Sequence, residues 1–539
     1  MAVTYNTPGV YVEEISTLPP SVAEVSTAIP AFCGYTETIG LKLTPTRIEA
    51  MLDYERLFGG PPEALTGVTI KSWDPATADI DLIVDAPKAD IPLLYYSLRM
   101  YFDNGGGPCY IVSLGGYDSS SSLDDFKNGL DALKKVDEPT LIVLPDAARL
   151  NSDFSDFVVA CARALDHCGE MMDRFAILDV KQGQDAAAFR NLSSDHLSYG
   201  AAYTPYLKTS LIYAYDEAKV DVANPPPWAT FGGINIVYFG KPGAKAEIVQ
   251  GTSGDPAFIA ACPPDPPKLT ITLNAQERTD VEIMTAWGKV SDKDKKGFYI
   301  EKKGDGGKVP VTSETTLTTD SKKLVALKTS ETALYNSIKA ALAKQRVTLP
   351  PSGAIAGIYA SVDRDRGVWK APANVAVASV IDLTQMFTDA EQGALNVDPT
   401  SGKSINVIRS FTGRGILVWG SRTLAGNDNE WRYIPVRRLF ITIEESTKKA
   451  TAFAVFEPND STTWLKVKAM IESYLYGLWE RGALAGAKPE DAYFVNVGLG
   501  ATMTTQDILE GRLIVEIGVA AVRPAEFIIL RFTHKLQVA

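Results

Sequence analysis

The sequence is poor in the residues from which most metal and redox sites are built. It has three histidines and five cysteines, and no two cysteines are spaced as CxxC. An odd, scattered set of cysteines in a chain of 539 residues is typical of buried thiols in a reducing compartment, not of a disulfide framework. These shortages leave little material for a histidine-based metal site, so we expect neither a metal nor another cofactor.

Long apolar runs and an excess of basic charge are also missing. The longest apolar stretches, such as Gly415–Gly420 and Gly518–Val522, fall far short of the ~20 residues that span a bilayer. The first residues lack the basic-then-apolar order of a secretory signal. Basic residues number 53 against 65 acidic ones, a net charge of −12. Because an acidic surface attracts neither nucleic acid nor anionic membranes, we expect neither as a partner, and no membrane insertion.

Apolar residues make up 45% of the chain, which is enough for several buried cores. Between residues 90 and 207, expected helices alternate with short apolar strands, which is typical of parallel βαβ units. Over 209–348, proline clusters and a stretch rich in Lys, Asp and Gly favour a mostly β insertion with one helix at Glu331–Gln345. The rest of the chain returns to an α/β pattern with two long helices, Ile434–Phe456 and Ser461–Arg481.

Both ends of the chain carry β-prone segments with no neighbouring strand close in sequence. One is Val10–Ile15, and the other is a strand expected over Phe527–Leu536, separated from the preceding strand by Pro524. The apolar side chains that define these segments are Val10, Tyr11, Val12, Ile15, Phe527, Ile529 and Phe532. We expect such segments to pair with distant sheet edges or with other copies of the chain.

Motifs that could carry catalysis are incomplete. Ser401–Ser404 resembles the end of a phosphate-binding loop, but Val397 stands where that loop needs its first glycine. His167 and Cys168 are adjacent on one expected helix, so their side chains diverge. Asp363–Arg366 alternates in charge, which is typical of a self-neutralised surface loop. We therefore expect a protein that is not an enzyme, with an α/β hydrolase as the rival hypothesis.

The helix expected over Ser461–Arg481 has a divided surface. An apolar stripe at helical spacing predicts packing on a core, and it consists of Trp464, Val467, Ile471, Leu475 and Leu478. The opposite face mixes both charges with a tyrosine and would suit a docking surface. That face consists of Lys466, Lys468, Glu472, Ser473, Tyr476 and Glu480.

Several segments resemble contractile tail sheath proteins, for example Gly415-Ile416-Leu417-Val418-Trp419-Gly420-Ser421-Arg422-Thr423-Leu424. The other similar segments are 7–14, 27–36, 102–106, 350–359, 366–374, 431–438 and 524–532. They cover the N-terminus, the middle and the C-terminal third. The region 209–348 has no such likeness, as expected of the variable outer domain of that family.

The resemblance implies a structural subunit of a phage tail or of a released, extracellular contractile injection particle, made in the bacterial cytoplasm. In that family, stacked hexameric rings surround an inner tube, exchange strands at both chain ends, and contract by rigid-body repacking to drive the tube through an envelope. The implied partners are further copies of the chain, the tube protein, baseplate and terminal cap proteins, and paralogous sheath subunits. The polar helix face named above would then face the tube. A static capsid or surface-layer protein is an alternative, beside the hydrolase.

The resemblance also implies the fold class: a multi-domain α/β protein, α+β overall, with a discontinuous inner domain. The division that we expect is an exchange arm at 1–26, an inner domain at 27–90 and 375–523, a middle α/β domain at 91–208 and 349–374, a β-rich outer insertion at 209–348, and an exchange strand at 524–539.

Overall fold

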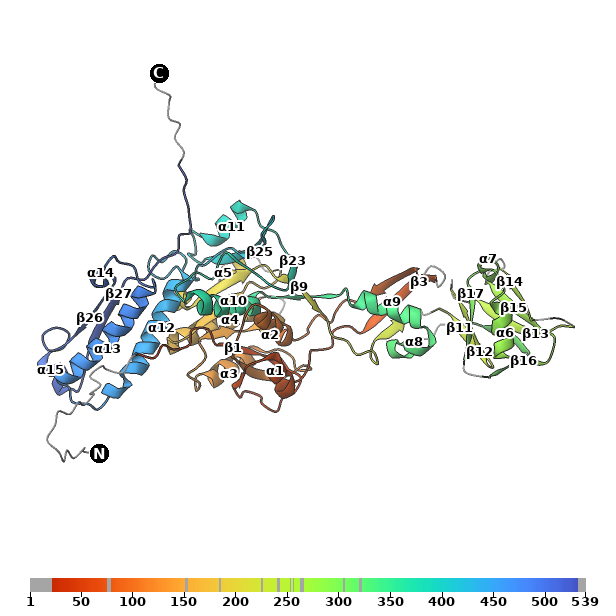
Figure 1. The fold of residues 1–539 in the computed structure, drawn as a ribbon, viewed down its shortest axis with the longest axis horizontal. Helices are drawn as coiled ribbons and strands as arrows, with labels where there is room; N and C mark the ends of the chain where they lie inside the picture. Colours follow the sequence, from red (N-terminus) through yellow and green to blue (C-terminus); the bar gives the residue numbers. More distant parts are fainter. Residues whose placement is uncertain are drawn as a thin grey trace, which may run out of the picture. The chain divides into compact units, whose positions relative to one another are not determined.

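The chain folds into two compact units in the computed structural model (Figure 1). Unit 1 comprises Met1–Gly59, Tyr96–Leu207 and Leu349–Ala539, and unit 2 comprises Gly60–Tyr95 and Lys208–Thr348. The structure describes residues 22–74, 79–150, 154–183, 186–223, 226–239, 243–252, 254, 256–261, 266–303, 306–318 and 322–531. Within these ranges, no helix combines the length and hydropathy needed to cross a bilayer.

Unit 1 is built on a nine-stranded mixed sheet. In spatial order its strands are β2 (Thr46–Ile48), β5 (Cys109–Gly116), β1 (Pro30–Thr36), β6 (Leu141–Val143), β7 (Phe175–Asp179), β8 (Gly200–Thr204), β24 (Ile405–Phe411), β25 (Gly415–Val418) and β22 (Val375–Ala376). The run from β5 to β24 is parallel throughout, which confirms the βαβ pattern expected from the sequence.

Helices cover both faces of this sheet. On β1, where every residue is buried, the ring of Phe32 lies 5.3 Å from that of Tyr101 in α2 (Leu94–Asp103). The next residue, Cys33, faces Gly129 of α3 (Leu123–Leu133). Successive side chains of a strand point to opposite faces, so α2 and α3 lie on opposite sides of the sheet. This double cover explains why β1, β6, β7 and β8 are buried at every position.

The helix α10 (Ser352–Arg366) packs closely against α2 through two glycines. A Cβ at Gly353 would lie 2.5 Å from the Ser97 carbonyl oxygen, and one at Gly357 would lie 2.4 Å from that of Tyr101. Both separations are shorter than any normal contact, so a side chain at either position would force the helices apart.

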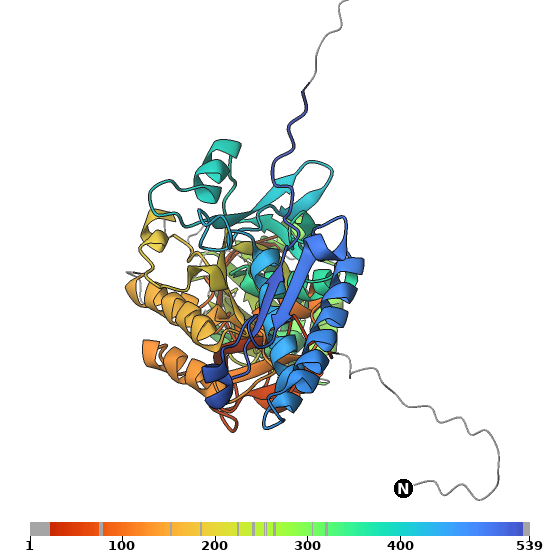
Figure 2. The same ribbon diagram turned by 90° about the vertical axis from the view of Figure 1, so that its left-hand side faces the viewer.

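The C-terminal part of unit 1 forms a separate hydrophobic core. It contains α12 (Ile434–Ala450), α13 (Ser461–Glu480), β26 (Tyr493–Val497) and β27 (Val515–Val519), which lie beside one another in Figure 2. The Asp460 carboxylate accepts hydrogen bonds from the first backbone N–H groups of α13, and Gly482 follows the helix with φ near +80°, so both ends of the helix carry a local end signal.

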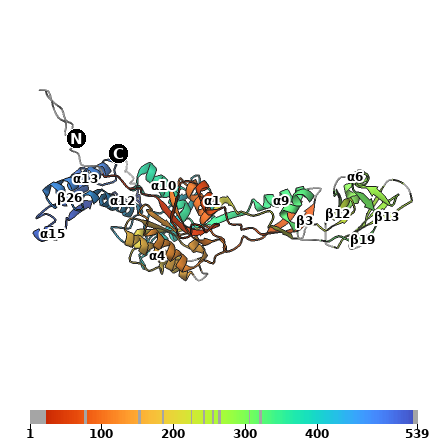
Figure 3. The same ribbon diagram turned by 90° about the horizontal axis from the view of Figure 1, so that it is seen from below.

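Unit 2 has two hydrophobic cores. One joins β3 (Gly67–Asp74), β4 (Asp79–Val84) and β10 (Asp221–Ala223) with α8 (Leu324–Ser330) and α9 (Thr332–Leu342); Figure 3 shows α9 beside β3. The other joins two small sheets with α6 (Asp280–Trp287). In spatial order, the first sheet consists of β11 (Trp228–Phe231), β12 (Ile234–Tyr238) and β17 (Phe298–Lys302), and the second of β14 (Ala257–Ala261), β15 (Lys268–Leu273), β13 (Lys245–Gln250) and β19 (Thr312–Thr316).

The remaining helices and strands complete the two units. The helices are α1 (Met51–Phe58), α4 (Ser155–Met171), α5 (Ala186–Arg190), α7 (Asp292–Lys295), α11 (Asp389–Asn396), α14 (Pro489–Ala492) and α15 (Thr505–Leu509). The strands are β9 (Leu207–Ile212), β16 (Glu277–Thr279), β18 (Lys308–Pro310), β20 (Lys322–Lys323), β21 (Arg346–Leu349) and β23 (Val380–Leu383).

The insertion contains more helix than the sequence analysis predicted. Besides α9, which lies within the expected Glu331–Gln345, it includes α6, α7 and α8. The start of α6 carries a reciprocal cap, in which the Thr279 hydroxyl accepts from the Glu282 N–H and the Glu282 carboxylate accepts from the Thr279 N–H. The Thr-x-x-Glu spacing is the sequence signal that indicates the start of this helix, and the sequence analysis missed it.

The domain division differs from the expectation in two places. Residues 60–90 were grouped with the inner domain, but they pack in unit 2, where β3 pairs in parallel with β10. Residues 27–59 were placed in the inner domain as well, yet β1 lies between β5 and β6, strands assigned to the middle domain. Both corrections arise from strand pairing between distant segments. The other boundaries stay predictions.

Candidate functional site

The strands β26 and β27 form a sheet of only two strands. They pair from Tyr493↔Val519 to Val497↔Val515, and in the part of the chain that the structure describes they join no third strand. One face packs on α13, with Val495 buried. Both outer edges therefore offer backbone groups that another strand can pair with.

The outer face of this two-stranded sheet carries an apolar platform. Phe494 is 50% exposed and lies across Gly518 on the neighbouring strand. A Cβ at Gly518 would be 2.2 Å from the phenylalanine ring, so the ring occupies the space that a side chain would need. An added strand would find an aromatic surface already in place beside the edge.

The C-terminal segment is fastened to unit 1 through one carboxylate, that of Glu526. Arg422 donates to it with Nε at 2.9 Å and Nη2 at 2.6 Å, which is a two-pronged, charge-assisted contact. Asn396 donates through Nδ2 at 2.7 Å, and the Tyr433 hydroxyl at 3.3 Å. We call these four residues the Glu526 clamp.

The sheet holds the clamp in place. Arg422 follows β25, and its backbone N–H donates to the side-chain oxygen of Asn406 on β24 at 2.8 Å. The Asn406 amide donates back to the Arg422 carbonyl, also at 2.8 Å. Asn406 is buried, so this reciprocal pair holds the backbone of Arg422 in place, and the guanidinium donates in turn from Nη1 to the Gly426 carbonyl at 3.3 Å.

The pKa of Glu526 reports the strength of the clamp. Burial acts to raise the pKa of this carboxyl, but hydrogen bonds from Arg422 and Asn396 outweigh burial, and the pKa lies below its ordinary value. Glu526 is therefore ionised at neutral pH and its pair with Arg422 is formed.

Four consecutive apolar residues follow the clamp. Phe527, Ile528, Ile529 and Leu530 are 68–80% exposed, and the trace leaves the body of unit 1 without secondary structure (Figures 1 and 2). The strand expected over Phe527–Leu536 is thus not formed in the single chain as far as Arg531. Val10, Tyr11, Val12, Ile15 and Phe532 lie outside the described residues, and their role in strand exchange stays a prediction.

The N-terminal segment is also fastened where it enters unit 1. The Val25 N–H donates to the Ser446 hydroxyl at 3.1 Å, and the Thr27 carbonyl accepts from Arg438 at 2.9 Å. Arg481 pairs with Glu24 at 3.0 Å. We call residues 24–27 with these partners the N-terminal root.

Arg438 ties the N-terminal root to the core. Its guanidinium also contacts Asp363 at 2.5 Å and 3.0 Å, and both side chains are at most 4% exposed. The segment Asp363–Arg366 is thus not the expected surface loop: it forms the last turn of α10, and Asp363 is a buried ion-pair partner. The alternating charges of this segment do not indicate a buried ion pair, because Arg438 comes close to Asp363 only in the folded chain.

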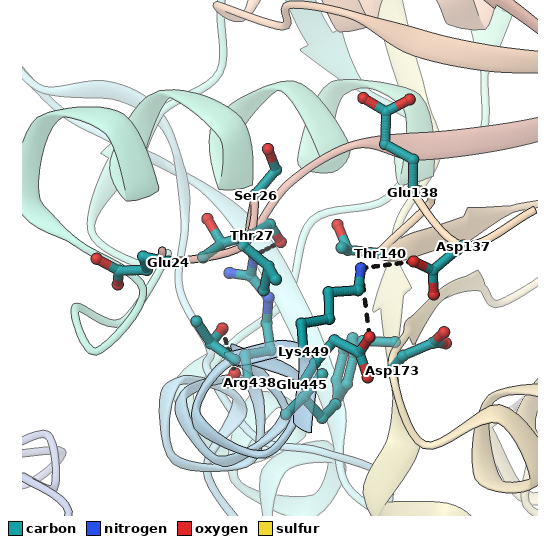
Figure 4. A pocket seen from close by; sticks show the side chains of 14 residues that line it. Glu24, Ser26, Thr27, Asp137, Glu138, Thr140, Asp173, Arg438, Glu445 and Lys449 are labelled. Atoms are coloured by element: carbon teal, nitrogen blue, oxygen red, sulfur yellow. Dashed lines mark hydrogen bonds and ion pairs between the residues drawn. The ribbon is translucent and has the colours of Figure 1, made fainter. Parts of the chain in front are cut away.

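A cavity of about 300 Å³ lies between the N-terminal root and α12 (Figure 4). Lys449 reaches across it to Asp137 at 2.7 Å and Glu445 at 3.3 Å, as the dashed lines show. Lys449 thus pairs within the cavity, whereas Arg438 and Glu24 pair with Asp363 and Arg481 outside its lining, as at a structural junction. Among the described residues, no group of three or more His, Cys, Asp or Glu side chains is placed to hold a metal ion.

The loop around Ser401–Ser404 also has a structural role. The Lys403 ammonium donates to the Arg190 carbonyl at 2.6 Å and to that of Leu192 at 2.5 Å. Asp398 accepts from the Ser401 backbone N–H at 2.8 Å. The lysine thus joins two segments of unit 1.

The outer face of α13 matches the expected division in part. Lys466, Ser473, Tyr476 and Glu480 are exposed, whereas Lys468 and Glu472 are half-buried and pair at 3.7 Å. The buried stripe also includes Met470 and Tyr474, which the sequence analysis missed, and Trp464 is only partly buried. Leu465, 67% exposed, adds an apolar side chain to this side of the helix. The assignment of this face to a tube stays a prediction.

The clamp also escaped the sequence analysis. Arg422 and Glu526 both lie in segments noted for their resemblance to sheath proteins, but 104 residues separate them. Comparisons with known proteins cover both ends of this contact: the phage tail sheath protein central domain matches residues 265–424, and the phage tail sheath C-terminal domain matches 426–535. A chain from the cryo-EM structure of the anti-feeding prophage baseplate is 30% identical, with 99% of this chain and 100% of that chain covered and a TM-score of 0.56.

The chain belongs to the phage tail sheath family. This sheath protein is also similar to a chain of the PVC sheath complex, an extracellular contractile injection system solved in its contracted state. That chain is 27% identical, with 99% of both chains covered and a TM-score of 0.55. The tail sheath protein of Vibrio phage KVP40 is 26% identical over 136 residues, which span 25% of this chain and only 20% of the phage protein. The family is one of structural proteins.

Proposed function

We propose that the protein is the polymerising subunit of a contractile sheath, in a phage tail or an extracellular injection particle. The proposal rests on the presence, in one chain, of both a segment that can add as a strand and a sheet that can accept one, neither of which has a partner strand within the described residues. The donor is the exposed apolar run Phe527–Leu530, and the acceptor is the two-stranded sheet β26–β27. Because the donor leaves its own unit, the acceptor belongs to a neighbouring copy.

The donor run is suited to a strand that is covered on both sides. In an extended strand Phe527 and Ile529 share one face, and Ile528 and Leu530 share the other, so both faces are apolar. Burying each such side chain contributes about 1.5–3 kcal/mol as an upper estimate, beside ~1 kcal/mol for each backbone hydrogen bond. That burial is enough to hold copies together after the cost of ordering the segment.

The assembly would be open-ended. Donor and acceptor are different surfaces, so the contact is heterologous and propagates as a helical array. Val10–Ile15 would supply a second donor on the other side of each copy. Contraction would then be a repacking of rigid units while the exchanged strands stay paired, with the energy stored in the extended assembly.

The inner partner of this array would be a tube protein, gripped by the outer face of α13. The contact between sheath and tube must be able to break or shift during contraction. A face of mixed charge suits such a contact, because it binds more reversibly than an apolar face. Baseplate proteins, a terminal cap and paralogous sheath subunits would bind the ends of the array.

Removing the donor tests the proposal. We expect a chain ending at Glu526 to purify as folded monomer that forms no tubes in negative-stain images, and Ile529→Asp to behave in the same way. Ile259→Asp is the matched control, because Ile259 is an isoleucine 64% exposed on β14 of unit 2. Tubes of normal appearance from the truncated chain would overturn the proposal.

Two further measurements separate the remaining alternatives. A contractile sheath must show two lattice geometries by cryo-EM, extended and contracted, whereas a static capsid or surface-layer protein shows one. Reversing charge at Lys466 and Lys468 should weaken co-assembly with the tube protein, whereas reversal at Lys448, 70% exposed on α12, should not. Unchanged co-assembly would remove α13 from the tube contact.

A further inference from the structure

We infer that the Glu526 clamp is the mechanical anchor of the C-terminal exchange strand: Arg422, Asn396 and Tyr433 hold the Glu526 carboxylate so that the strand leaves the subunit at a fixed point. The inference rests on the proposed strand exchange and adds a positioning site to it. The sheath family accounts for the strand, and the structure assigns the residues that hold its base.

Glu526 is the last point at which the chain is held. Upstream, backbone hydrogen bonds fasten the segment after β27, from Ala520 to Ala492 at 2.8 Å and from Val522 to Ala483 at 3.3 Å. The next attachment is the clamp. From Phe527 to Arg531, where the description of the chain ends, no side chain or backbone group is bonded to the body.

Packing against unit 1 holds the base of the strand only loosely, because residues 523, 525, 527 and 528 are exposed. Residues 522–528 form one wall of a cavity of about 660 Å³, whose other walls include Trp369 and Trp419. A segment that borders a cavity of this size lacks the close contacts of a packed core. The polar contacts of Glu526 therefore carry the attachment.

The clamp passes force to the central sheet of unit 1. Arg422 is bonded through its backbone to Asn406 on β24, which pairs with β8 in the central sheet. A pull on the exchanged strand would reach Glu526, then the guanidinium, then the sheet. Without the clamp, the same pull would act on the single hydrogen bond of Val522 and on the hairpin edge beyond it.

Losing the clamp would lengthen the free segment. Four residues, 523–526, would join the free segment, and at ~3.3 Å each they add about 13 Å of reach. Side chains return to the same face of a strand every ~6.6 Å, so this slack permits a register shift of two residues or more. The clamp thus sets both the reach and the register of the exchanged strand.

The test compares Glu526→Gln with Arg523→Gln, a neighbouring exposed charge outside the clamp. In the full-length monomer, spin labels at Leu530→Cys and Asp428→Cys should give a markedly broader distance distribution for Glu526→Gln and an unchanged one for Arg523→Gln. Assembly should need about tenfold more protein for Glu526→Gln, and its sheaths should break more often when contraction is triggered.

A second variant distinguishes loss of the clamp from a general folding defect. Glu526→Asp keeps the charge but is one methylene shorter, so it should show the same broadening with an unchanged melting temperature. An unchanged distance distribution and an unchanged critical concentration in both variants would overturn the inference. The proposed strand exchange fails on a different result, namely assembly by the chain that ends at Glu526, so the two failures are distinguishable.

Discussion

The two ends of the chain are fastened to unit 1 in different ways. At the N-terminal root, backbone groups of Val25 and Thr27 bond to side chains of α12, and one of these side chains, Arg438, is itself part of a buried ion pair. At the C-terminal end, the last attachment of the described chain is a single side chain, that of Glu526. One end is joined to the folding core, and the other is held at a local site.

This difference shows which attachment can be altered without destabilising the fold. Removing Arg438 leaves Asp363 uncompensated in the core of unit 1, so the N-terminal root cannot be weakened without weakening the fold. The Glu526 carboxylate is 20% exposed and water can replace its partners. The C-terminal attachment is therefore the one at which assembly can be adjusted at small cost in stability.

The largest effect is expected at the N-terminal root. Arg438→Met removes one partner of a pair whose side chains are 3% and 4% exposed, and should lower the free energy of unfolding by about 3–5 kcal/mol. Urea denaturation followed by circular dichroism measures this. Arg364→Met is the matched control, because its pair with Asp365 is about 60% exposed, and it should change stability by less than ~1 kcal/mol. Equal effects would erase the distinction between the two ends.

A smaller effect is expected at the clamp. Glu526→Ala leaves the Arg422 guanidinium without its carboxylate and should cost about 1–3 kcal/mol in the same experiment. The loss stays below that of Arg438→Met because solvent reaches the site. A larger loss than at Arg438 would show that the clamp belongs to the folding core after all.

Acid should weaken the C-terminal attachment. The pKa of Glu526 is lower in the folded chain, so its contribution to stability is present above the unfolded-state pKa of about 4.3 and is lost as pH falls through the folded value. The difference in unfolding free energy between wild type and Glu526→Gln should shrink from pH 7 to pH 3.5. A difference that stays constant over this range would contradict the role of the ionised carboxylate.

The smallest effect is expected at the exposed part of the N-terminal root. Glu24→Gln breaks a pair with Arg481 whose side chains are 31% and 49% exposed, and should cost about 0.2–1 kcal/mol at low ionic strength. Raising the salt to about 1 M should abolish most of that loss. A larger or salt-independent loss would mean that this pair also contributes to the core.

Local patterns predicted the helices and strands of unit 1 well. The strands after residue 100 are short apolar runs because helices cover both faces of the sheet, and this double burial is visible in the sequence. The capping carboxylate of Asp460 and the glycine at 482 are equally local signals. The helix α6 was missed because it is only eight residues long and its apolar residues do not fall on a single face, although the Thr279 and Glu282 spacing indicates its start.

The attachments of the two ends could not be predicted in the same way. Arg422 and Glu526 are 104 residues apart, and Thr27 and Arg438 are 411 apart. No spacing rule joins residues at such separations, since a side chain's partner depends on which strands become neighbours. The same limit explains why residues 60–90 were grouped with the wrong part of the chain.

By itself, the sequence determined that the chain has apolar, β-prone ends, an α/β core and the segments of a tail sheath protein. Those properties depend on residues close together, whose side chains set local geometry and burial. Only the tertiary structure decided where each end is fastened and how firmly. The strength of an ion pair depends on its burial and on the groups around it, and these exist only once the sheet has assembled.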